Sequence, residues 1–124
     1  MKRRPSLLLS LLALAAASTL AQQADPVSTL TRELRARTPA QWLVRVRWRD
    51  RQLLASITPL PYDTAFQLWY EPQKLHETLT GLCPQPGAEI WTLLQPDQDV
   101  ILEPTVGGKS GVEARVSCRT LPTS

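Results

Sequence analysis

Apolar residues occupy every second position from residue 42 to residue 48, with Leu43 as the one apolar residue between them, and again every second position from residue 53 to residue 57. A period of two is typical of a β-strand with one buried face. Joined by a loop at 49–52, the two segments would form a hairpin with three apolar pairs: Trp48 with Leu53, Val46 with Ala55 and Val44 with Ile57. The pattern predicts two antiparallel strands whose apolar side, Trp42 and Trp48 included, faces the core.

Two other segments show the spacing of an amphipathic helix. The first has Asp25 as a favoured N-cap and Pro26 as its first residue, and Pro39 ends it. Its apolar stripe is Val27, Leu30 and Leu34. The second helix is expected at 72–81, where Pro72 suits the first turn. Its apolar stripe is Leu75, Leu79 and Leu82.

The remaining apolar runs are interpreted as further strands. We expect a strand at 65–70, a buried strand at 88–94, a strand at 100–102 and a last strand at 112–119. The order is then helix, three strands, helix, three strands. The sequence predicts a small single α+β domain with an antiparallel sheet of about six strands, an N-terminal helix and a second short helix.

The N-terminus indicates export. Three basic residues precede an apolar run at 7–17 and small residues ending at Ala21, which is typical of a secretory signal peptide at 1–21. The apolar run is short for a membrane span, so we expect a periplasmic or extracellular domain at 22–124 with no membrane span after cleavage and a flexible tail at 120–124. In such a compartment Cys83 and Cys118, the only cysteines, are expected to form a disulfide.

Removing the signal peptide changes the charge. The formal net charge of +3 comes from Lys2, Arg3 and Arg4, because residues 22–124 hold 11 basic and 11 acidic residues. The charges are unevenly distributed: residues 22–62 carry seven arginines and three acids, whereas residues 63–124 carry four cations and eight acids. The basic and acidic halves could therefore pair with each other, within one chain or between two copies.

The predicted hairpin carries the strongest candidate binding feature, a basic stripe on the polar side of its first strand. The stripe comprises Arg45, Arg47 and Arg49, with Arg51 in the loop and Arg32, Arg35 and Arg37 as an extension. The stripe has three interpretations: it binds an acidic protein, it binds an anionic envelope polymer, or it is only a solvated face. Nucleic acid is not favoured, because single-strand binders place aromatics and cations on one surface, whereas Trp42 and Trp48 lie on the opposite side. Trp69 and Trp91 are expected as an exposed aromatic pair that contributes to binding.

Few residues suit catalysis. His76 is the only histidine and lies off the apolar stripe of its helix, and both cysteines are expected to be bridged. We therefore predict no catalytic residues, no metal site and no cofactor. A carboxylate-dependent hydrolase is the alternative from another class, with three candidate acids: Glu89, Asp99 and Glu103.

These features favour a non-enzymatic exported domain that binds another macromolecule through the basic strand face, as an envelope accessory, assembly or inhibitor protein. A structural or self-associating exported protein is the third hypothesis. The sequence leaves the oligomeric state open.

Overall fold

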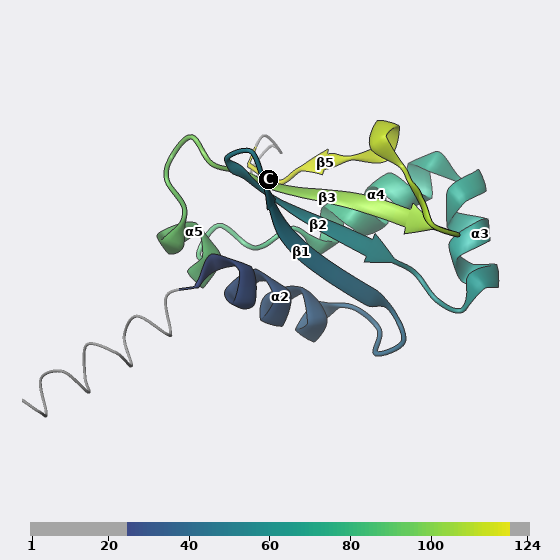
Figure 1. The fold of residues 1–124 in the computed structure, drawn as a ribbon. Coiled ribbons are helices and arrows are strands. Elements are labelled where there is room, and N and C mark those ends of the chain that lie inside the picture. The colour runs from purple at the N-terminus through teal and green to yellow at the C-terminus, as the bar shows by residue number, and fades with distance from the viewer. Residues whose placement is uncertain (1–24, 120–124) are drawn as a thin grey trace, which may run out of the picture.

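The computed structural model describes residues 25–119. Its helices are α2 (Pro26–Arg37), α3 (Tyr62–Tyr70), α4 (Pro72–Leu82), α5 (Glu89–Leu93) and the 3-10 turn η1 (Val112–Ala114). Its strands are β1 (Leu43–Arg49), β2 (Gln52–Thr58), β3 (Val100–Val106), β4 (Lys109–Ser110) and β5 (Val116–Ser117). The chain is thus an α+β fold with a five-stranded sheet (Figure 1). The expected signal peptide at 1–21 and tail at 120–124 lie outside the described residues.

The N-terminal part of the prediction is confirmed. α2 is capped by Asp25, whose side chain accepts a hydrogen bond from the Val27 amide, and it ends before Pro39. The hairpin of β1 and β2 has the predicted register. Trp48 lies opposite Leu53, and the other two predicted apolar pairs also lie opposite each other. Its turn is formed by Asp50 and Arg51, and Asp50 adopts a positive φ of 56°, a conformation that Asp tolerates better than most residues.

The sheet is mixed rather than purely antiparallel. It runs in the order β1-β2-β3-β4, with β5 also paired to β3, and β2 and β3 are parallel. Between these two strands the chain forms α3, α4 and α5, and such a long crossover returns the chain in the same direction. The prediction of an all-antiparallel sheet with an α-βββ-α-βββ order is therefore wrong at this step.

Three predicted strands differ in the structure. Residues 62–70 form α3, because burial of Ala65 and Leu68 follows a helical spacing while Phe66 and Tyr70 stay exposed. The run at 88–94 contains the short helix α5, which buries Ile90. The last segment breaks into η1 and the two-residue β5. Alternation over a few residues does not distinguish these outcomes, since short apolar runs suit helix and strand alike.

One face of the sheet carries the core. Register places Val44, Leu53, Ala55, Val100 and Leu102 on the same side, where they form one cluster with the buried apolar residues of the helices. α2 packs along β1, whereas α3 and α4 pack toward β3 and β5 (Figure 1).

The two tryptophans of the predicted first strand are less buried than expected. Trp42 is partly buried against the core cluster, but Trp48, at the end of β1, is 43% exposed. The prediction that Trp48 is a core residue is wrong, although Leu53, opposite it on β2, is fully buried in the core cluster.

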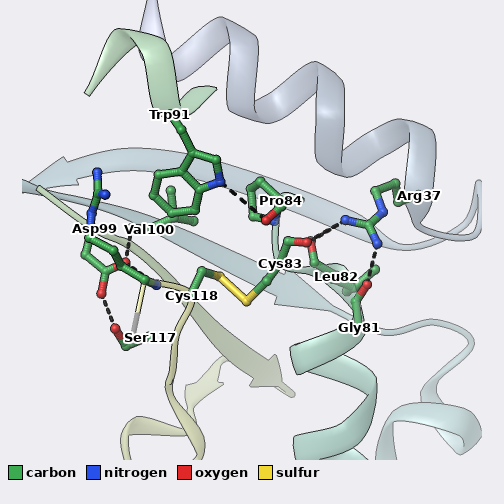
Figure 2. The surroundings of a disulfide bond; sticks show 11 residues. Arg37, Gly81, Leu82, Cys83, Pro84, Trp91, Asp99, Val100, Ser117 and Cys118 are labelled. Atoms are coloured by element: carbon green, nitrogen blue, oxygen red, sulfur yellow. Dashed lines mark hydrogen bonds between the residues drawn. A yellow bond between two sulfur atoms is a disulfide. The ribbon is translucent and has the colours of Figure 1, made fainter. Parts of the chain in front are cut away.

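The predicted disulfide is present and joins the helical layer to the sheet. Cys83 follows α4 directly, and Cys118 follows β5 (Figure 2). Beside the bond, the Arg37 guanidinium donates hydrogen bonds to the carbonyls of Gly81 and Cys83, both at 2.6 Å. This arginine of α2 therefore satisfies carbonyl groups at the C-terminal end of α4, which have no partner within the helix.

Within residues 25–119, no helix is long and apolar enough to cross a membrane.

Candidate functional site

The outward face of β1 presents the predicted arginines. Arg45, Arg47 and Arg49 are exposed and lie on the side of the sheet opposite the core cluster. Register places Ser56, Leu54 and Gln52 beside them on β2. Among the described residues, Arg45 and Arg47 form no ion pair and no side-chain hydrogen bond. We call the surface formed by Arg45, Arg47 and Arg49 the arginine face.

A buried carboxylate belongs to the same side of the sheet. Glu103 of β3 is 1% exposed and pairs with Arg115, whose Nε donates to its carboxylate. Burial raises the pKa of Glu103, but hydrogen bonds from Arg115 and Ser110 and the positive charges of Arg115 and Arg49 outweigh burial, so that its pKa lies below the usual value. The negative charge of Glu103 is thus balanced by Arg115 and Arg49, and it does not neutralise Arg45 or Arg47.

The proposed extension of the stripe does not join this face, because Arg32, Arg35 and Arg37 lie on α2, which packs against the core side of the sheet through Leu30 and Leu34. Arg32 on α2 pairs with Glu89 on α5 at 2.9 Å, and Arg37 binds the end of α4. Arg51 in the hairpin turn pairs with Asp97 at 2.9 Å. Two of these contacts link the basic first half of the chain to the acidic second half, so part of the charge asymmetry is neutralised within one molecule.

The two predicted binding tryptophans do not form a pair. Trp91 on α5 is partly buried against the core, and its Nε1 donates to the Pro84 carbonyl at 3.4 Å (Figure 2). The guanidinium of Arg119 lies 4.7 Å from the centre of its ring, a cation–π distance. Trp69 lies on α3, which is at the far end of the molecule from α5 (Figure 1).

Around Trp69 the structure reveals a surface that the sequence interpretation missed. Three further aromatic side chains of α3 are exposed: Tyr62 at 55%, Phe66 at 44% and Tyr70 at 69%. Their rings contact one another at four-residue spacing, with centroids 5.9 Å apart for the first pair and 4.7 Å for the second. The signal was present as an i, i+4, i+8 repeat, but interpreting 65–70 as a strand placed alternate residues on opposite faces. We call Tyr62, Phe66, Trp69 and Tyr70 the aromatic ridge.

Trp69 lines two hollows. One, of about 280 Å³, lies among the aromatic ridge and the β3–β4 turn, where Lys109 contributes to its lining. The other, of about 620 Å³, lies between α4 and η1 and includes His76 and Glu113. Gly107 and Gly108 have positive φ angles of 58° and 79°, a conformation that favours glycine and returns the chain toward α3.

The three carboxylates of the hydrolase hypothesis serve separate local contacts. Glu89 is exposed on α5 and paired with Arg32. Asp99 precedes β3 and accepts hydrogen bonds from the amides of Val100 and Arg119. Glu103 is four residues further along β3, roughly 13 Å away along the strand, which exceeds the separation of paired glycosidase carboxylates. In residues 25–119, no three potential ligands of the His, Cys, Asp and Glu types are grouped to hold a metal ion.

A scan against protein-family models found no match, and searches of curated proteins and of solved structures found none either.

Proposed function

We propose that the protein is an exported, non-enzymatic domain that binds an acidic macromolecule, either an acidic protein or an anionic envelope polymer, through the arginine face. The observation that carries this proposal is the exposure of Arg45 and Arg47 without an acidic partner among the described residues. Both are exposed on one face of a regular strand, and neither has an acidic partner among the described residues. An exported location rests on the N-terminal pattern at 1–21.

The spacing of the arginines suits a repeating anion. Alternate residues of a strand lie about 6.6 Å apart, so Arg45, Arg47 and Arg49 form a line of guanidinium groups. Each planar guanidinium can donate two parallel hydrogen bonds to one carboxylate or phosphate. A partner with acidic groups at a similar repeat would engage two or three of them together. Nucleic acid remains a poor partner, because Trp48 lies on the other face of β1 and Trp42, just before β1, packs against the core cluster.

A structural role for the same arginines is the rival explanation. β1 is the edge strand of the sheet, and charged side chains on edge strands oppose pairing with another sheet. The two explanations make different predictions. Edge protection requires charge of either sign, whereas binding an acidic partner requires positive charge.

Charge reversal therefore tests the proposal. We expect Arg45→Glu/Arg47→Glu to lose the macromolecules that co-purify with the protein from its own envelope or culture fraction. The matched control is Arg35→Glu/Lys74→Glu, which changes net charge equally at exposed positions on α2 and α4. Retention of the same partners by a folded Arg45→Glu/Arg47→Glu protein would refute binding through the arginine face.

The local contacts of Glu89, Asp99 and Glu103 support the non-enzymatic part of the proposal. Each carboxylate takes part in an ion pair or a hydrogen bond, and Asp99 and Glu103 are roughly 13 Å apart along the chain, farther than the paired carboxylates of glycosidases.

A further inference from the structure

The aromatic ridge is a concentration of apolar surface in a small part of the chain. Four of the seven aromatic residues of the sequence lie within the nine residues of α3, and all four are exposed by 36% or more. Single exposed apolar residues are common, but a contiguous group of large ones is not. These four rings are on the surface, whereas Leu68 of the same helix is buried.

The area of the ridge is in the range of functional patches. An aromatic side chain buries about 200 Å² when fully enclosed, so rings exposed by 36–69% present roughly 400 Å² together. Specific protein interfaces bury about 1,000 Å² or more in total. Two such ridges in contact, with the exposed Val112 and the rims of the hollows added, reach that size.

The surface combines an exposed row of rings with two hollows. Tyr62, Phe66 and Tyr70 form the row and line the 280 Å³ hollow together with Trp69, which also lines the 620 Å³ hollow. A two-fold axis near Trp69 would place the row of one molecule against the hollows of another, which is the condition for an isologous interface.

The charges at the rims are also self-complementary. Lys109 lines the smaller hollow and Glu113 lines the larger one, and Trp69 contributes to both. The same two-fold axis would bring Lys109 of each copy toward Glu113 of the other. The centre of the surface is aromatic and the opposite charges lie at its edges, as is usual in protein interfaces.

From these observations we propose that the aromatic ridge is the contact surface between two copies of this chain. The proposal does not depend on the arginine face. The ridge belongs to α3, whereas Arg45 and Arg47 are on β1, on the side of the sheet away from the core cluster. A dimer formed through α3 would present two arginine faces, and loss of either surface by mutation would leave the other intact.

The first test measures molar mass by sedimentation equilibrium of residues 22–124 over a range of concentrations. We expect a monomer–dimer equilibrium in the micromolar range for the wild type and at least a roughly tenfold weaker equilibrium for Phe66→Ser. Trp48→Ser is the matched control, because Trp48 is exposed to the same degree, 43% against 44%, but lies on β1. Tyr70→Ser provides a second variant at a position that is 69% exposed, in case Phe66→Ser disturbs folding.

The second test uses the rim charges. Lys109→Glu alone and Glu113→Lys alone each place like charges opposite one another in a homodimer, so both variants should self-associate more weakly. Mixed together, they restore both opposite-charge contacts, and an equimolar mixture should form a heterodimer at concentrations where each variant alone is monomeric. Detection by differently labelled chains makes the heterodimer visible directly.

A wild-type protein that stays monomeric up to about 1 mM, or a dimer that Phe66→Ser and Tyr70→Ser leave unchanged, would overturn the proposal. A monomer that uses the ridge to bind another protein or a neutral sugar polymer would also overturn it, because the proposed occupant is a second copy. A mixture of the two charge variants that remains monomeric would exclude the two-fold arrangement described above.

Discussion

The arginine face and the aromatic ridge are both exposed, but their exposure has different physical meanings. A solvated arginine is in its favoured environment, so the accessibility of Arg45 and Arg47 by itself requires no explanation. Exposed rings forgo the favourable burial that Leu68, on the same helix as Phe66, achieves. The exposed hydrophobic surface is therefore the stronger evidence of an interface, whereas the arginine face gains its weight from the absence of neutralising partners among the described residues.

The two surfaces also differ in what holds them in place. The arginine face stands on a seven-residue strand in continuous register, and the buried Glu103 fixes Arg115 nearby. In the aromatic ridge, by contrast, Trp69 packs closely against Gly111, which also lies against Pro104. The first surface should respond to changes of charge, and the second to changes of volume.

Removing the covalent link between the layers should have the largest effect. Cys83→Ser/Cys118→Ser opens a loop of 35 residues between α4 and β5, and the loss of loop-closure entropy in the unfolded state predicts a decrease of about 4 kcal/mol in the free energy of unfolding. Urea unfolding monitored by circular dichroism measures it. The reduced wild type should match the double variant, and a decrease under about 1 kcal/mol would contradict the entropic account.

The second-largest loss of stability should come from removing the buried carboxylate of Glu103 in the sheet. Glu103→Gln leaves Arg115 without its ionic partner in a largely buried position, and we expect a loss of about 2–3 kcal/mol in the free energy of unfolding. The matched control is Glu89→Gln, which removes the exposed pair with Arg32 and should change stability by less than about 1 kcal/mol. Equal effects of the two substitutions would show that Glu103 has no special role.

A single added methyl group should perturb the ridge. A Cβ at residue 111 would lie 2.9 Å from Cγ of Pro104 and 3.2 Å from Cζ3 of Trp69, so Gly111→Ala should reduce stability by about 1–2 kcal/mol and displace the indole. Gly81→Ala is the control, because no atom outside its neighbours and its own helix backbone lies within 4 Å of the added Cβ and alanine favours helix, so this variant should gain up to about 1 kcal/mol. Trp69 fluorescence should shift in the first variant only.

A smaller effect is expected in the pH dependence of stability, which tests the side of the sheet that carries Glu103. Because the pKa of Glu103 is lowered in the folded protein, the unfolded chain takes up its proton first as the pH falls below the usual value of 4.5. The stability that Glu103 contributes is fully present above that pH and is lost as the pH falls through its folded pKa. Glu103→Gln should therefore show a shallower decline of melting temperature between pH 5 and pH 3 than the wild type, and identical slopes would contradict this assignment.

The sequence predicted best where a regular pattern extended over several turns or pairs. The register of Val44, Val46 and Trp48 against β2 followed from alternation over seven residues, and the single possible disulfide followed from the two cysteines. The stripe of Leu75, Leu79 and Leu82 likewise placed α4.

Prediction failed where a short segment suited two periods. Residues 65–70 suit a strand as a short segment, but in the structure the buried residues Ala65 and Leu68 follow a helical spacing. The error concealed the aromatic ridge, because the i, i+4 repeat of Tyr62, Phe66 and Tyr70 is meaningful only on a helix. The partners of Arg32, Arg37 and Arg51 are likewise distant in sequence, so which arginines stay unneutralised could be learned only from the fold.

Binding of a defined polyanion tests the central claim most directly. Fluorescein-labelled poly-L-glutamate is titrated with residues 22–124 at low and moderate salt, and anisotropy gives the Kd for the wild type, Arg45→Glu/Arg47→Glu and Arg35→Glu/Lys74→Glu. Unchanged melting temperatures confirm that all three proteins are folded. We predict salt-sensitive binding by the wild type, at least a tenfold weaker Kd for the first variant and a change within about twofold for the second. Equal weakening in both variants, or no binding by the wild type at low salt, would contradict the assignment of acidic-ligand binding to the arginine face.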